Sequence, residues 1–364
     1  MDAGKSLRDH GVLIGELEPG PTGSIADVEG VAVGHVTVVR DEPDPPEGRG
    51  VARSGVTAVV PGPLDRLWAE PLPAGVAVLN GAGELTGSLE IAEWGQLATP
   101  VYLTATMSLG RVYDGAVSVA VAADARIGVE APVIPVVGEC DDSWLNDTRV
   151  VQVEAADAGR AVADAGSSAG VAGGAVGAGT GMVCFDWKGG IGSSSRVTGE
   201  GHTVGVLVLA NFGVRSELRV DGVPVGRLLE GQASRSVPAG SCIAVVATDA
   251  PLGSAQLTRV ARRAGLGLAR TGSVAHHGSG EIFLAFATTG RRPRAELGRR
   301  VAAESLPDAE LDPLFAATVD ATEEAVANAL WAAGDVTGRA GRVAPGLPHA
   351  AVLELLRSHG RLGP

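Results

Sequence analysis

Two long apolar runs most strongly limit how this chain can fold. They are HTVGVLVLANFG at 202–213 and SCIAVVATDAP at 241–251. Each has the length of a strand, is rich in valine and lacks the polar alternation of a half-exposed strand, so each is predicted to be a buried strand. Such strands need cover on both faces, which favours a fold in which helices pack on sheets.

The segment after the second run supplies a covering helix. Leu257, Val260, Ala261, Ala264 and Leu268 recur at helical spacing, and arginines lie between them. This pattern predicts an amphipathic helix with its basic face outward.

Sheet-forming and helical segments alternate along the rest of the chain, and no linker separates two cores. We therefore expect a single α/β domain over 1–364, with sheets sandwiched between helical layers. Residues 40–54 are expected to form an exposed loop, and Asp221-Gly222 predicts a hairpin turn within 217–226. Strands are expected in 21–38 (a strand pair), 55–63, 100–108, the first part of 133–148 and 276–289, and helices at roughly 86–95, before Ala123, and at 152–166, 308–333 and 347–359.

Charge excludes some classes of partner. The formal net charge is −13, so the chain lacks the basic footprint that nucleic-acid binding requires. It has no polybasic stretch for an anionic membrane and no run of about 20 apolar residues for a membrane helix. The composition predicts neither a nucleic-acid partner nor a membrane partner.

Cysteine usage points to a reducing compartment. The chain has 3 cysteines, far apart and without a CxxC pair, so neither a zinc site nor a disulfide framework is indicated. The N-terminus lacks the apolar run of a secretory signal. We expect a cytoplasmic protein.

The junction between Gly240 and Ser241 suggests a self-cleaving bond. Glycine reaches backbone conformations closed to other residues, and a hydroxyl residue follows it at the start of a buried strand. Attack of that hydroxyl on the preceding carbonyl would leave a serine with a free α-amine, whose pKa of about 7.7–8.0 suits a base at neutral pH. The plainer alternative, a serine that begins a strand after a turn glycine, is far more common.

Several long strings give this junction a family context. Together they closely resemble the L-aminopeptidase/D-esterase family, which includes the β-peptidyl aminopeptidases, and they occur in the family's order. The strings are GPTGSIADVEGVAVGHVTV (20–38), LNGAGELTG (79–87), GAGTGMVCFDWKGGIGSSSR (177–196), VGVLVLANFG (204–213), GSCIAVVATDAPL (240–252) and HGSGEIFLAFAT (277–288).

The resemblance implies a fold and a maturation step. Members are made as one chain, are cut before a serine, and adopt an αββα sandwich of the N-terminal-nucleophile type. Here that implies cleavage between Gly240 and Ser241, an α subunit of 1–240, a β subunit of 241–364 and oligomers of αβ pairs. Ser241 matches the family's nucleophile.

Three further residues match the family's catalytic strings. Asn211 ends a buried run, where its amide can donate to an oxyanion, although an asparagine there can also cap a turn. Ser279 and Glu281 are two apart, so in an extended strand they share a face. The resemblance implies that this pair orients the hydroxyl and the α-amine of Ser241; the alternative is a loop serine followed by a solvent-facing glutamate.

Substrate contacts are expected from two other positions. Glu139 follows the apolar part of 133–148, and the resemblance implies that it pairs with the free amine of a substrate. Asn80, with Glu84, could line the pocket or belong to a plain glycine turn. The chain departs from the family at two places. Ala105 stands where the family tends to have an asparagine. Cys140, Asp141 and Asp142 stand where a threonine and an aromatic hydroxyl are expected.

The remaining candidate residues are not expected to take part in catalysis or metal binding. Cys242 should face away from Ser241 into the core, and His276 and His277 lack a metal-ligand spacing. We expect no metal and no organic cofactor. The glycine-rich GAGTG lacks the ending of a phosphate-binding loop.

These observations predict a self-processing serine aminopeptidase or amidase that acts on small peptides, amides or esters. One alternative is an acyltransferase like the related glutamate N-acetyltransferases, which carry threonine where this chain has Ser241. The other is a non-catalytic nucleotide-binding module built on the glycine-rich run.

Overall fold

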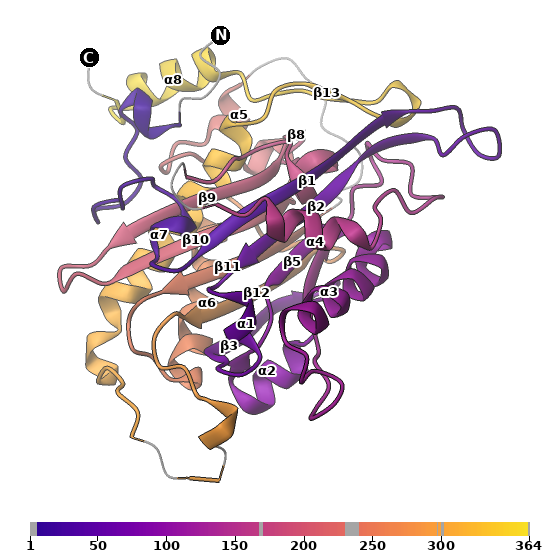
Figure 1. Cartoon of the computed structure of the whole chain (residues 1–364). Coiled ribbons are helices and arrows are strands. Elements are labelled where there is room, and N and C mark those ends of the chain that lie inside the picture. The colour runs from indigo at the N-terminus through magenta and orange to yellow at the C-terminus, as the bar shows by residue number, and fades with distance from the viewer. Residues whose placement is uncertain (1–5, 167–169, 230–239, 297, 300–301, 363–364) are drawn as a thin grey trace.

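The computed structural model describes residues 6–166, 170–229, 240–296, 298–299 and 302–362. Two β-sheets lie face to face, and helices cover the outer face of each (Figure 1). The expected αββα sandwich is confirmed.

The larger sheet carries both apolar runs in its interior. It has six strands in the order β4-β3-β12-β11-β10-β9. Neighbours β11 and β12 are parallel, and the other neighbours are antiparallel. The strands are β3 (Leu72–Gly81), β4 (Gln96–Leu97), β9 (Gly190–Val197), β10 (Thr203–Asn211), β11 (Ser241–Thr248) and β12 (Gly280–Ala287).

The smaller sheet has four strands in the order β1-β2-β5-β6. Its first two strands form a long antiparallel hairpin that extends past the body at the right of Figure 1, whereas β5 and β6 are parallel. The strands are β1 (Ala32–Asp41), β2 (Val51–Val60), β5 (Val101–Ala105) and β6 (Val136–Cys140).

Four helices form the outer layers. The helices α6 (Ser254–Arg270) and α7 (Asp312–Trp331) pack on the larger sheet, and α3 (Leu109–Ala123) and α4 (Ala156–Ala163) pack on the smaller one. The remaining helices and strands are α1 (Leu64–Leu67), α2 (Ser88–Trp94), α5 (Val225–Leu228), α8 (His349–Ser358), β7 (Val183–Cys184), β8 (Trp187–Lys188), β13 (Val336–Thr337) and β14 (Val343–Ala344).

Strand β11 shows why its run had to be apolar throughout. Its side chains alternate between two cores: Cys242 and Val246 pack against the helices, and Ile243 and Val245 pack between the sheets. A strand in the middle of a covered sheet has no solvent-facing side. The prediction that Cys242 belongs to the core is confirmed, because its side chain is fully buried.

Two expectations near the N-terminus were wrong. The segment 21–38 forms one strand instead of a pair, because Ser24 caps a short 3₁₀ helix at Ile25–Asp27. The loop expected at 40–54 is shorter, since β1 continues to Asp41 and β2 begins at Val51.

The hairpin expected within 217–226 is only a turn. Asp221 and Gly222 have positive φ values of 47° and 77°, as a tight two-residue turn requires. The flanking residues Val220 and Val223 form a single bridge. No strands extend from it because α5 begins at Val225 and a 3₁₀ helix ends at Glu217.

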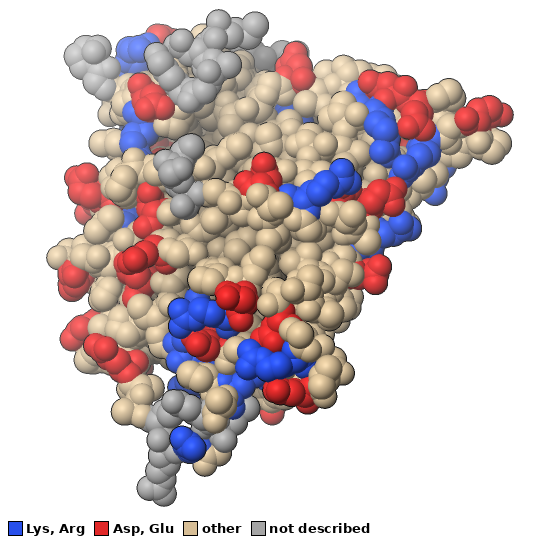
Figure 2. Space-filling view, viewed as in Figure 1, with Lys and Arg blue, Asp and Glu red and all other residues tan. Residues whose placement is uncertain are grey.

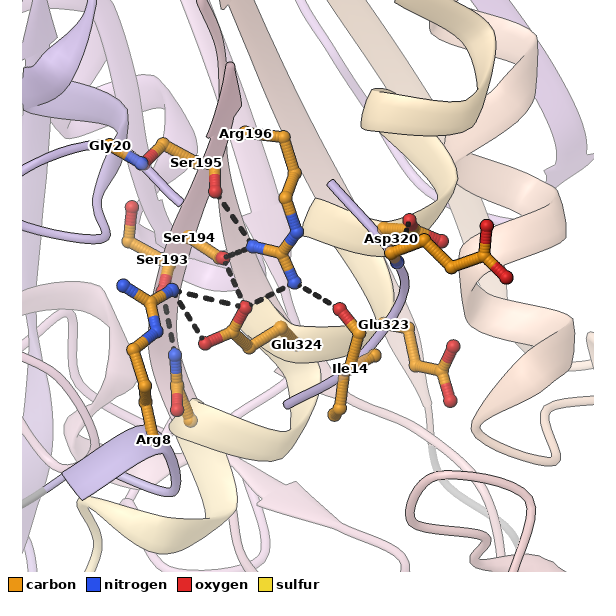
Figure 3. Close-up of polar contacts among 12 residues, drawn as sticks. Arg8, Ile14, Gly20, Ser193, Ser194, Ser195, Arg196, Asp320, Glu323 and Glu324 are labelled. Carbon is orange, nitrogen blue, oxygen red and sulfur yellow. Dashed lines mark hydrogen bonds and ion pairs between the residues drawn. The ribbon is translucent and has the colours of Figure 1, made fainter. Parts of the chain in front are cut away.

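A buried ion cluster ties the N-terminal segment to the larger sheet and its covering helix (Figure 3). Glu324 on α7 pairs with Arg196 on β9 at 2.5 Å and with Arg8 at 3.0 Å. Arg196 also donates to the carbonyl of Ile14 at 2.5 Å, and Ser194 donates to Glu324 at 2.9 Å. Because Arg196 and Glu324 are almost fully buried, removal of either partner would leave the other as an uncompensated buried charge.

Charged side chains of both signs share the visible surface (Figure 2). On the face drawn in Figure 2, the lysine and arginine side chains lie interspersed with acidic ones instead of forming one basic patch. Among the described residues, no helix combines the length and the apolar character needed to cross a membrane. The same part of the chain contains no cluster of three or more His, Cys, Asp or Glu residues that could hold a metal ion.

Candidate active site

Strand register brings four of the predicted residues to one end of the larger sheet. Asn211 on β10 is the direct neighbour of Ser241 on β11. On the next strand Glu281 is paired with Cys242, and it is also paired with Asn80 on β3. Residues far apart in the sequence therefore lie in one row across four adjacent strands.

Ser241 begins β11 and is buried, with 4% of its surface exposed. Its hydroxyl donates to the carbonyl oxygen of Gly240 at 2.6 Å. The hydroxyl thus lies beside the carbonyl of the Gly240–Ser241 peptide bond, for which the sequence predicts cleavage.

Gly240 occupies a place where a side chain would not fit. A Cβ there would lie 2.9 Å from the Cα of Phe212 and 3.1 Å from the carbonyl oxygen of Asn211. Since both obstacles belong to the backbone of the neighbouring chain segment, they cannot yield easily. The glycine is explained by this close approach; its φ is not among the positive values.

Asn211 is the last residue of β10, and its amide is held on both sides. The N–H of Val183 donates to Oδ1 at 2.9 Å, and Nδ2 donates to the carbonyl of Asp141 at 2.9 Å. These contacts fix which side of the amide carries the N–H groups. One N–H of Nδ2 remains for another acceptor, as an oxyanion donor requires.

Ser279 and Glu281 form the expected pair. The Ser279 hydroxyl donates to Oε1 of Glu281, and Oε2 has no hydrogen-bond partner among the described residues. Burial raises the pKa of Glu281 above its ordinary value, while Ser279 and the nearby amide of Asn80 oppose this rise.

In the intact chain the pair of Ser279 and Glu281 is not hydrogen-bonded to Ser241 within the described residues. Glu281 instead neighbours Cys242, whose pKa is raised chiefly by burial and further by this carboxylate. Asn80, the strand partner of Glu281 on β3, donates to the carbonyl of His276 at 2.9 Å.

Glu139 reaches the same end of the molecule from the smaller sheet. Its Oε1 accepts the N–H of Glu84 at 2.9 Å, and its Oε2 accepts the hydroxyl of Thr106. A Cβ on Gly83 would lie 3.2 Å from Oε1 of Glu139 and 3.6 Å from the Cα of Gly280. The carboxylate is therefore only a short distance from the start of β12.

The environment of Glu139 raises the pKa of its carboxyl group. Burial is the main reason that its pKa is raised, while the hydrogen bonds from Thr106 and Glu84 oppose this and the charges of Asp141 and Glu84 add to it. The strand β6 continues through Cys140, so Glu139 belongs to the strand instead of following it.

Some functional contacts were not found in the sequence. Thr106, Val183 and the carbonyl of Asp141 hold Glu139 and Asn211 in place. The last two act through backbone atoms, which carry no residue-type signal. The glycine-rich GAGTG forms a buried 3₁₀ helix at Gly177–Gly181, so its backbone is covered by protein.

The amino-acid sequence matches a known protein family over most of its length. The model of peptidase family S58 matches residues 23–344. The chain belongs to this family. It is therefore a hydrolase of the serine aminopeptidase and amidase type, as the sequence analysis expected.

Individual relatives agree with this membership. The β-peptidyl aminopeptidase BapA of Sphingosinicella microcystinivorans is 40% identical over 378 residues, which cover 99% of this chain and 93% of that protein. The solved structure of a β-aminopeptidase from Burkholderia sp. has a TM-score of 0.87 at 42% identity and covers 99% of this chain and 100% of its own.

A third relative bears on the fold. The L-aminopeptidase D-Ala-esterase/amidase of Ochrobactrum anthropi has a TM-score of 0.89 at 37% identity, covering 98% of this chain and 99% of its own. Its structure is described as a prototype for the serine aminopeptidases and as a new variant among the N-terminal-nucleophile hydrolase folds.

Proposed function

We propose that this chain cuts itself between Gly240 and Ser241 and that the new N-terminal serine then releases N-terminal residues from small peptides, amides or esters. The observation that carries the proposal is the position of Ser241, whose hydroxyl lies 2.6 Å from the Gly240 carbonyl oxygen and whose strand neighbour is Asn211.

Self-cleavage would proceed by acyl transfer within the chain. The Oγ of Ser241 attacks the carbonyl carbon of Gly240, the C–N bond breaks, and the hydroxyl proton ends on the released amine. Water then hydrolyses the ester, which gives a carboxylate at Gly240 and a free α-amine at Ser241. The products are fragments 1–240 and 241–364.

The mature site would repeat this chemistry on a substrate. The α-amine of Ser241, with a pKa of about 7.7–8.0 in model peptides, accepts the hydroxyl proton as Oγ attacks the substrate carbonyl. Asn211 donates to the oxyanion. The Ser279–Glu281 pair orients the new amine, which exists only after cleavage, and water releases the acyl group.

The substrate would be selected by its free amine. Glu139 is a buried carboxylate near the nucleophile's end of the sheet, which suits a substrate ammonium group. Asn80, which is paired with Glu281 across β3 and β12, would line the same substrate site. Because the curated relatives are named β-peptidyl aminopeptidases, peptides that begin with a β-amino acid are the first substrates to test.

The assembly and location are parts of the same proposal. The two fragments remain together as one αβ unit, and these units associate into oligomers. The three cysteines are free and buried, which suits a cytoplasmic protein.

Mass spectrometry of the purified chain and of Ser241→Ala tests the proposal. We expect two fragments divided at 240–241 from the first and one intact chain from the second. Hydrolysis of amino-acid p-nitroanilides should occur only with the cut protein. An active protein with an uncut bond at this position would refute the mechanism.

A further inference from the structure

Lys188 is a buried cation that the mechanism above leaves unused. It lies on β8 and is fully buried. Its ammonium group donates to three backbone carbonyls, those of Gly179 at 2.8 Å, Met182 at 2.8 Å and Gly189 at 2.7 Å. No ion pair of Lys188 occurs in the described part of the chain.

Such an arrangement calls for a reason. An ammonium group removed from water loses several kcal/mol of hydration unless other groups replace the water. Here three carbonyl dipoles replace it, one for each N–H of the group. Burial still lowers the pKa of Lys188 to about 7. An apolar side chain would fill the space without this penalty, but each of the three carbonyls would lose a charged donor.

The three carbonyls belong to the segment that holds Asn211. Met182 immediately precedes Val183, whose N–H donates to Oδ1 of Asn211 at 2.9 Å. Gly189 donates to the carbonyl of Met182 at 3.1 Å, which closes the β7–β8 hairpin around the ammonium group.

The far end of this hairpin contacts Phe212, the residue that follows β10. The N–H of Phe185 donates to the carbonyl of Phe212 at 2.7 Å, and the rings of the two residues meet edge to face with centroids 5.2 Å apart. The hairpin is thus held against the end of β10 at two points. Lys188 fixes the base of the hairpin at Met182 and Gly189, next to Val183.

We propose that Lys188 is a positioning residue for catalysis: it fixes the Val183 N–H, which in turn orients the Asn211 amide so that Nδ2 faces the oxyanion. This inference rests on the proposed role of Asn211. A small rotation of an oxyanion donor weakens its hydrogen bond in the transition state more than it weakens substrate binding.

A double-mutant cycle with Lys188→Met and Asn211→Ala tests the proposal, using the cut protein and an amino-acid p-nitroanilide. We expect Lys188→Met to lower kcat by about tenfold or more and to change KM by less than about threefold. In the Asn211→Ala background the same change should alter kcat by less than about twofold, because the amide it orients is gone.

The matched control is Arg196→Met. Arg196 is also a buried cation and also donates to backbone carbonyls, those of Ile14 and Ser195, but it lies on β9 away from the hairpin. It should lower the melting temperature and leave kcat per active site unchanged. A purely structural Lys188 would behave in the same way, or its effect would be fully additive with Asn211→Ala. Either result would overturn the inference.

Amide hydrogen exchange provides a readout that does not depend on turnover. In Lys188→Met the Val183 N–H should exchange faster, while β11 keeps its protection; unchanged exchange at Val183 would contradict the inference. If Lys188→Met does not fold, Lys188→Gln replaces it, since its amide keeps two donors. A wild-type chain that neither cuts nor turns over would refute the proposed function and with it the catalytic role of Lys188, whereas exchange at Val183 would still show whether Lys188 fixes that N–H.

Discussion

Glu139 illustrates how single side chains prepare the site. A carboxylate can accept about four hydrogen bonds, and Glu139 accepts one on each oxygen from the described residues, from Glu84 and from Thr106. It therefore keeps free acceptor positions although it is buried. A substrate ammonium group could occupy them without displacing either donor.

Replacement of Glu139 should weaken substrate binding more than turnover. Glu139→Gln keeps the shape but removes the charge, and a hydrogen bond to a charged group contributes about 1.5–3 kcal/mol. We expect KM for an amino-acid p-nitroanilide to rise by about tenfold or more. Glu93→Gln, on the exposed side of α2, is the control and should leave KM within about twofold. Equal KM values for the two variants would exclude the proposed contact.

Glu139 should also determine how kcat/KM declines at acidic pH. Burial raises the pKa of Glu139 above 4.5, and only the ionised form attracts an ammonium group. As the pH falls through this raised pKa, kcat/KM should therefore decline at a higher pH than an ordinary glutamate would give. Glu139→Gln should lack this limb in kcat/KM, measured from pH 4 to 8. A limb of unchanged position in the variant would assign it to another group.

At the scale of elements, the loop after β6 contains an unusual acid. Asp142 is fully buried, accepts a hydrogen bond from Nδ2 of Asn146 at 3.1 Å and leaves Oδ2 without a partner among the described residues. Burial raises its pKa from 3.8 to about 7. The neighbouring Asp141 carbonyl accepts a hydrogen bond from Asn211. The loop that contains the buried Asp142 therefore also holds a residue of the candidate site.

This acid predicts a particular dependence of stability on pH. Because the folded pKa exceeds the unfolded one, the folded state binds more protons between about pH 4 and 7, and stability falls as the pH rises through that window. Asp142→Asn should be more stable than the wild type at pH 8 and should have a shallower slope, because only the contribution of Glu323, whose pKa burial also raises to about 7, then remains large in this window. Urea unfolding at pH 5 and pH 8 would show it. An identical slope in both proteins would contradict the assignment.

The elements were predictable where their pattern is local. The apolar runs gave β10 and β11, and helical spacing gave α6. Sheet order was not predictable, because it depends on pairings such as Glu281 with Asn80 between distant segments. The hairpin around Asp221 failed for a related reason: the turn chemistry is local, whereas strands need partners that the fold does not supply there.

The site was predictable only in part. Ser241, Asn211, Ser279 and Glu281 were found because whole strings around them resemble a family, since each residue type alone is common in strands and turns. Lys188 was missed although it stands in one of those strings. Its importance depends on the three carbonyls it contacts, and nothing in a sequence marks a carbonyl as a partner.

At the scale of the whole molecule, the two expected fragments are interleaved. The strands β11 and β12 of 241–364 lie between β10 and β3, which both belong to 1–240. The helices α6 and α7 of the second fragment cover the sheet that the two fragments share. Cleavage would therefore remove one covalent bond and leave both interfaces of β11 and β12 intact.

We expect the cut protein to behave as one particle until it is unfolded. Size-exclusion chromatography should give a single peak that contains both fragments in equal amounts, and only denaturant should separate them. The Ser241→Ala chain should elute at the same volume. Elution of fragment 1–240 by itself from native cut protein would contradict this packing.

The position of β11 and β12 also indicates that folding must come before cleavage. A chain of 1–240 made alone would have a gap where two central strands belong, with unpaired backbone on both borders, and such borders promote aggregation. A continuous precursor avoids this state, because both pieces arrive together and in equal number. If the chain is cut as proposed, synthesis as one polypeptide completes the sheet first, and the bond before Ser241 becomes dispensable only afterwards.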